Sequence, residues 1–67
     1  MSDNFVVVAT DGEDRLMARR EDVKAGNYDG DAYIEMDGQK PDAIRYRPLQ
    51  TFFKFGTWEL IPLENIK

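Results

Sequence analysis

The side chains that could do chemistry in this chain are mostly carboxylates, because it contains no histidine and no cysteine. Residues 29–37 are rich in acids around Gly30, and hard cations such as calcium bind several carboxylate oxygens around a sharp glycine turn. The spacing does not fit a calcium-binding loop: with Gly30 at the sixth position, Ala25 and Met36 occupy the first and twelfth. We therefore interpret these acids as solvated turn residues, and we expect no metal and no cofactor.

Pairs of carboxylates can also transfer protons, and Glu35 lies close in sequence to Asp37. Acid–base catalysis needs a pocket that shifts a pKa and excludes water, and a domain of 67 residues rarely encloses one. The chain has no glycine-rich phosphate loop, and its single serine, Ser2, lies at the terminus rather than in a nucleophile elbow. The sequence therefore predicts a protein that is not an enzyme.

The formal net charge of −4 argues against a general DNA-binding protein, which would depend on neutralising phosphates. Carboxylates on a binding surface attract basic residues of a partner, and they raise association rate and specificity more than affinity. We expect an acidic partner-binding surface made of Asp11, Glu13, Asp14, Asp29, Asp31, Glu35 and Asp37.

A second candidate surface combines aromatic and basic side chains, which are common in binding hot spots and in single-stranded nucleic-acid sites. The same residue types are also ordinary components of a core or a solvated strand face, and the acidic remainder of the chain would repel phosphates. The members of this alternative surface are Phe52, Trp58, Ile61, Tyr46, Arg45 and Arg47.

The elements that must position these side chains begin with a strand over residues 5–10, rich in valine and followed by the turn signal Asp11-Gly12. Residues 13–25 are ambiguous, because they tolerate a helix but place no clean apolar stripe on it. We favour a strand over residues 15–20 that pairs with the first one, then a helical turn over residues 21–25.

A short strand is expected over residues 32–36, closed by Asp37-Gly38. Pro41 disfavours a strict two-residue hairpin here, because the returning strand would lack a donor, so a longer turn is predicted. Residues 43–47 alternate apolar and basic side chains and predict a further half-buried strand, which Pro48 ends.

The last third of the chain predicts a β-hairpin, with residues 51–55 and 58–63 on either side of Gly56-Thr57. Gly at the first position of a two-residue loop suits a type II′ turn. The predicted cross-strand pairs place Phe53 and Leu60 in the core, whereas Phe52 and Ile61 could face either a core or a partner. The expected pairs are Phe55 with Trp58, Lys54 with Glu59, Phe53 with Leu60, and Phe52 with Ile61.

The sequence as a whole predicts one small domain over residues 1–67, of the mainly β class. We expect five or six short strands in an antiparallel meander or an SH3- or OB-like barrel, with one short helix near residues 20–26 as the alternative to continuous strand. The absence of cysteine and of a membrane-length apolar segment favours a cytoplasmic protein without membrane contact.

The function that these features favour is binding to another protein. A small acidic domain without catalytic groups is typical of inhibitors that phages and mobile elements encode, which mask a functional surface of their target. Two alternatives remain: a small nucleic-acid-binding β-barrel that uses the basic and aromatic side chains, and a structural subunit that self-assembles through strand edges as a homo-oligomer.

Overall fold

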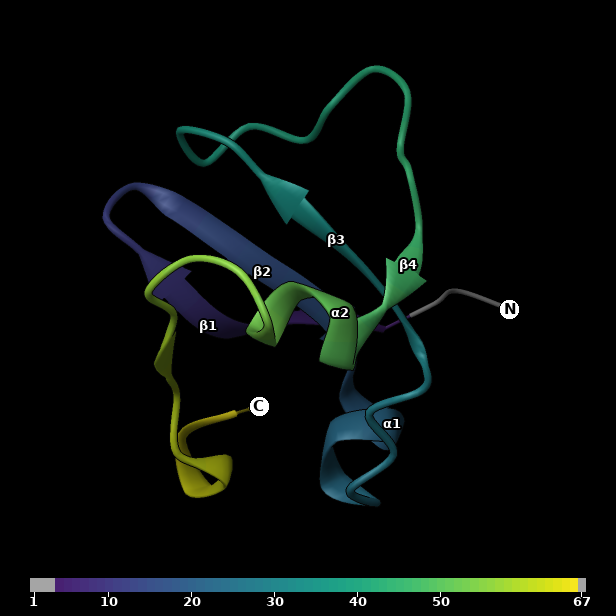
Figure 1. Ribbon diagram of the computed structural model, residues 1–67. Coiled ribbons are helices and arrows are strands. Elements are labelled where there is room, and N and C mark those ends of the chain that lie inside the picture. Colours follow the sequence, from purple (N-terminus) through teal and green to yellow (C-terminus); the bar gives the residue numbers. More distant parts are fainter. Residues whose placement is uncertain (1–3, 67) are drawn as a thin grey trace.

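One antiparallel five-stranded sheet forms the framework of the computed structural model, which describes residues 4–66 (Figure 1). The strand order is β4-β3-β2-β1-β5, so four strands form a meander and the fifth returns to the side of β1. The mainly β class is confirmed, and the sheet is open rather than closed into a barrel. The strands are β1 (Phe5–Asp11), β2 (Asp14–Arg19), β3 (Asp31–Glu35), β4 (Arg47–Pro48) and β5 (Glu59–Leu60); the helices are α1 (Arg20–Lys24), α2 (Leu49–Phe53) and the 3-10 turn η1 (Leu63–Asn65).

The hairpin of β1 and β2 confirms the first two predicted strands. Gly12 has a φ of 63°, and together with Glu13 it forms a two-residue loop that brings Asp11 opposite Asp14. The register shifts once, between Val7 and Ala9, so β1 carries a bulge. A bulge adds one residue to a strand and turns the chain locally.

Helix α1 confirms the prediction of a strand followed by a helical turn. The helix spans Arg20–Lys24 and buries Val23, the one residue of this segment that reaches the core. Gly26 follows with a φ of 74°, a conformation that glycine adopts without steric cost after a helix. A helix of five residues makes little more than one turn, so one buried apolar side chain is enough to attach it to the core. This explains why residues 13–25 show no continuous apolar stripe.

The turn after β3 differs from the prediction of a longer loop. Asp37 and Gly38 have φ values of 55° and 71°, and the Gln39 N–H donates to the Met36 carbonyl over 3.0 Å. Two consecutive residues with positive φ are typical of a type I′ turn. The returning strand is limited to a single bridge between Met36 and Gln39, and Pro41 lies just beyond it.

The strand predicted over residues 43–47 is wrong in its bounds. Only β4, Arg47–Pro48, pairs with β3, at Asp31 and Ala32. The chain between the Asp37-Gly38 turn and β4 arches away from the sheet (Figure 1). Pro41 and Pro48 each lack a backbone N–H, so a ladder along this segment would lose a donor at both of its ends.

The C-terminal hairpin is also wrong: residues 49–53 form helix α2, and β5 pairs with β1 at Ala9 and Thr10 instead of with residues 51–55. None of the four cross-strand pairs expected around Gly56 therefore exists. The physical reason is the spacing of Leu49, Phe52 and Phe53, which places three apolar side chains on one helical face directly after Pro48. In this helix Leu49 is almost completely buried.

The core lies between one face of the sheet and the segments that cross it. Leu16 is fully buried, and Leu49 on α2 is 1% exposed. Phe53 packs against this core as predicted, but Leu60 is 66% exposed, so its predicted burial is wrong. Leu60 belongs to a two-residue edge strand, and the chain instead packs Ile61 against the core. The buried apolar residues of the core are Val8, Ala9, Leu16, Ala18, Val23, Ala32, Leu49 and Ile66.

Candidate functional site

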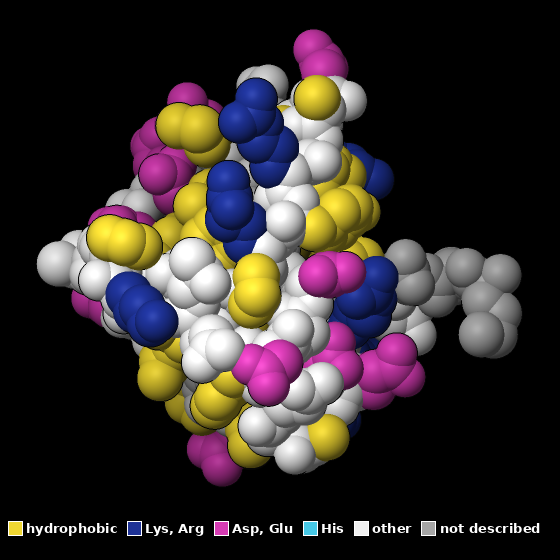
Figure 2. All heavy atoms as spheres, turned by 45° about the vertical axis from the view of Figure 1, so that its right-hand side comes forward, with side chains coloured by type: hydrophobic (Ala, Val, Ile, Leu, Met, Phe, Trp, Pro, Cys, Tyr) yellow, Lys and Arg dark blue, Asp and Glu magenta, His cyan; other side chains and the backbone are white. Residues whose placement is uncertain are grey.

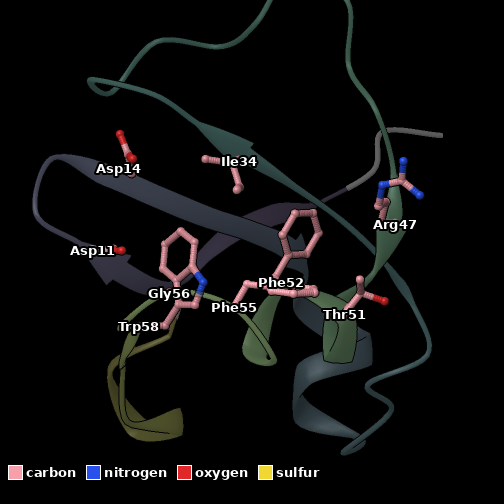
Figure 3. A pocket seen from close by; sticks show the side chains of 9 residues that line it. All are labelled: Asp11, Asp14, Ile34, Arg47, Thr51, Phe52, Phe55, Gly56 and Trp58. Carbon is pink, nitrogen blue, oxygen red and sulfur yellow. The ribbon is translucent and has the colours of Figure 1, made fainter.

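A groove of about 580 Å³ opens on the face of the sheet that α2 covers (Figure 3). It lies between α2 and the loop after it on one side and the outer part of β3 on the other. Its volume is in the range of pockets that accept a small ligand or a few side chains. The groove is lined by Asp11, Asp14, Ile34, Arg47, Thr51, Phe52, Phe55, Gly56 and Trp58.

Helix α2 and the loop after it supply the aromatic wall of this groove. Leu49 anchors α2 in the core, and this leaves Phe52 and Trp58 half-buried against the core with part of each side chain in the groove. Within the part of the chain that the structure describes, no other element covers Phe55, which is 70% exposed. Such exposure is unusual for phenylalanine, because this residue type is most often buried. The wall is therefore apolar, wide and open to solvent.

Gly56 and Asp11 hold this loop in place. Gly56 has a φ of 81°, and a Cβ atom at this position would lie 3.4 Å from Trp58 Nε1 and 3.5 Å from Asp11 Oδ2. The Thr57 hydroxyl donates to Asp11 Oδ1 over 3.3 Å. The positive φ expected at Gly56 is thus present, but it joins a helix to an edge strand rather than two strands of a hairpin.

The groove is acidic at one end. Asp11 and Asp14 are cross-strand neighbours that flank the β1–β2 loop, and like charges directly opposite each other destabilise a sheet. The Asp37 N–H donates to Asp14 Oδ1 over 3.4 Å, so the β3 turn also lies at this end. Each of the two carboxylates accepts one hydrogen bond within the fold, and a carboxylate can accept several, so both keep acceptor capacity for a partner.

The structure divides the predicted acidic surface into four parts. Asp11 and Asp14 line the groove, and Glu13 and Asp37 lie together on the adjoining turns around a separate hollow. Glu35 pairs in register with Arg15, on the sheet face opposite to Ile34.

Asp29 and Asp31 lie at the other end of β3 and serve the fold. The Asp29 carboxylate accepts a hydrogen bond from Gln50 Nε2, and the Asp29 N–H donates to Asn27 Oδ1 over 3.2 Å. Asp31 forms an ion pair with Arg19 at 3.6 Å. The two aspartates therefore do not belong to the same surface as the acids around the β1–β2 loop.

The alternative aromatic and basic surface is also divided. Phe52, Trp58 and Arg47 line the groove, and Arg45 lines an adjoining hollow of about 250 Å³ beside Phe52. Ile61 lies instead in a separate apolar hollow with Val8 and Leu49. In the space-filling view, Lys and Arg side chains form a short column on the upper half of one face, with acidic side chains to its left (Figure 2).

Tyr46 lies in an aromatic cluster away from the groove. Its ring is 5.9 Å from the ring of Tyr33 and 5.8 Å from that of Phe5, and the Arg19 guanidinium lies 5.0 Å from the centre of the Phe5 ring. Contacts of this kind stabilise a fold by aromatic and cation–π attraction. Tyr46 therefore contributes to packing on this side of the sheet.

Burial raises the pKa of Tyr33 above its usual value of 10.0, and the nearby Glu35 and Tyr46 raise it further. The unfolded chain then releases the phenolic proton of Tyr33 at a lower pH than the folded protein does. The contribution of this group to the free energy of unfolding is therefore complete below about pH 10 and is lost as pH rises through the folded pKa. We expect the free energy of unfolding to fall on alkaline titration and Tyr33→Phe to reduce this fall, as measured by urea denaturation at several pH values. Tyr28→Phe, at a half-exposed tyrosine, is the matched control, and an equal reduction in both variants would contradict the prediction.

The charged side chains of the groove carry no internal ion pair. Among residues 4–66, neither Asp11, Asp14 nor Arg47 lies within salt-bridge distance of an opposite charge. No cluster of three or more carboxylates within this range is arranged to hold a metal ion. In the same part of the chain, no helix has the length and apolar character needed to cross a bilayer.

Comparisons with protein-family models, with curated proteins and with solved structures found no match to this chain.

Sequence reasoning missed three lining residues of the groove: Ile34, Thr51 and the exposed position of Phe55. Recognising the helical spacing of Leu49, Phe52 and Phe53 would have placed Thr51 and Phe55 at the edge of a short helix. No local signal marks Ile34, because its role depends on which segment crosses the sheet above it.

Proposed function

We propose that this chain is a small acidic protein-binding module without catalytic activity, which covers a functional surface of a partner protein. One observation carries the proposal: the groove combines exposed aromatic side chains with carboxylates that have no internal ion pair among residues 4–66. Desolvated aromatic anchors supply most of the binding energy at protein interfaces, and complementary charges supply association rate and specificity.

The proposal includes an inhibitory role, of the kind carried by small proteins from phages and mobile elements. A domain of 67 residues can inhibit a target by covering part of its surface, and this needs no catalytic groups. The proposal also places the protein in the cytoplasm, which the absence of cysteine supports.

The two alternative functions have less support. Tyr46 packs beside Phe5 and Tyr33 and does not line the hollows that Arg45 and Arg47 share with Phe52, which weakens the case for one stacking surface for bases. Assembly through strand edges requires edge strands long enough to act as templates, whereas β4 and β5 contain two residues each.

The test is affinity capture of a partner from the cells that carry the gene, with the acidic end of the groove neutralised. The variant Asp11→Asn with Asp14→Asn keeps oxygen atoms that can accept the hydrogen bonds from Thr57 and Asp37. We expect a partner that the natural protein retains at low salt to be lost from this variant, because its basic groups no longer meet carboxylates.

The matched control carries Asp29→Asn with Glu64→Gln, which removes the same charge from exposed acids outside the groove. It should retain the partner. Equal retention by both variants, unaffected by salt, would overturn the proposed function.

A further inference from the structure

The groove carries opposite charges at its two ends. Figure 3 shows Asp11 and Asp14 at one end and Arg47 at the other, with Ile34 and Phe52 between them. Because none of these three charged side chains has an internal ion pair among residues 4–66, each is available to a bound partner. A partner that satisfies both ends must itself carry a cation and an anion, one for each end of the groove.

The length of the groove follows from the strand register. Asp14 precedes Arg15, which pairs with Glu35, whereas Arg47 pairs with Ala32. The two charged positions are therefore separated by two strand spacings across the sheet and about four residues along β3, or roughly 16 Å between their Cα atoms. A small metabolite does not bridge this separation, but an extended segment of about five residues does.

The middle of the groove suits one apolar side chain. Ile34 forms its floor, and Phe52, Phe55 and Trp58 form its wall. In an extended chain, the side chains of residues i, i+2 and i+4 point to the same side. If the first and fifth residues of a bound segment are charged and face the two ends of the groove, its third residue faces Ile34. The geometry thus matches a segment that alternates between groove-facing and solvent-facing residues.

We propose that the groove binds an extended segment of the partner protein that carries opposite charges four residues apart. A Lys or Arg lies at the Asp11 and Asp14 end, an apolar side chain lies over Ile34, and an Asp or Glu two positions further lies at Arg47. This inference rests on the proposed function and adds the chemistry of the segment that is recognised.

The experiment uses two synthetic five-residue peptides of identical composition, with capped ends. One has lysine first, leucine in the centre and glutamate last, separated by alanines, and the other has the glutamate directly after the lysine, so that its last two residues are alanines. Trp58 is the only tryptophan of the chain and lines the groove, so its fluorescence reports binding directly. We expect the first peptide to bind at least about tenfold more tightly, since only its spacing lets both charged ends of the groove be satisfied together.

A charge-reversed protein completes the test. The variant Arg47→Asp makes both ends of the groove acidic and should remove the preference for the first peptide. Circular dichroism checks that this variant is folded; if it is not, Arg47→Gln alone should abolish the difference, because Arg47 is exposed at the edge of the sheet.

Equal affinity of both peptides for the natural protein, or no binding of either at about 1 mM, would overturn the inference. The proposed function is tested separately from this inference. Its test is the capture of a whole protein by a variant that changes only Asp11 and Asp14. Capture that depends on these aspartates together with equal peptide affinities would leave the binding function in place and overturn the proposed spacing of opposite charges.

Discussion

Leu16→Ala should lower the free energy of unfolding by about 2–5 kcal/mol, the usual cost of removing a fully buried leucine side chain. Leu16 is fully buried in the centre of β2, where it pairs with Ala9 on one side and Ile34 on the other. Its small neighbours Ala9, Ala18 and Ala32 cannot expand to fill the space. A cavity would therefore remain at the middle of the sheet.

The size of this effect matters because the domain is small. At about 0.05–0.15 kcal/mol per residue, a chain of this length has a total stability of only roughly 3–10 kcal/mol. We expect Leu16→Ala to be largely unfolded near 37 °C, as measured by thermal and urea denaturation followed by circular dichroism.

Leu63→Ala is the matched control for this experiment, since it removes the same side chain at a position that is 55% exposed. Its change in stability should stay within about 0.5 kcal/mol. A loss of equal size in the two variants would show that the core is not centred on β2.

Phe55→Ala should weaken binding of the partner by about 30-fold, which corresponds to the 2 kcal/mol that defines an interface hot spot. Phe55 is 70% exposed and lines the groove, so its aromatic surface is free to be buried by a partner. For the same reason its removal should leave the free energy of unfolding unchanged within about 0.5 kcal/mol. The dissociation constant is measured by titration calorimetry with the captured partner.

The control for Phe55→Ala is again Leu63→Ala, an exposed apolar side chain outside the groove. Unchanged affinity in both variants would mean that the partner contacts another face. Loss of affinity in the Leu63 variant alone would assign binding to the apolar hollow that Leu63 lines.

The sequence alone determined the first half of the fold, because the signals there are local. The valine-rich run of β1 and the glycine of the β1–β2 loop specify a hairpin within some fifteen residues. The strand over β2, the helical turn of α1 and the strand β3 follow from the same short-range preferences. The absence of histidine and cysteine likewise limits the chemistry of the chain, whichever fold it adopts.

The second half was decided by tertiary structure. An aromatic-rich segment around Gly56 has strand propensity, yet residues 49–53 form a helix that buries Leu49 against the sheet. Strand β5 then pairs with β1, where the Ile61 N–H donates to the Val8 carbonyl over 3.0 Å, a contact that spans most of the chain.

The candidate site shows the same division. The acids at Asp11 and Asp14 were recognised from their residue type, but their place beside Phe52 and Trp58 was not. Neighbours that are about 40 residues apart in sequence meet only when α2 crosses the sheet. Local propensity acts over a few residues, whereas the burial of a shared core selects between distant pairings, so the groove exists only in the folded protein.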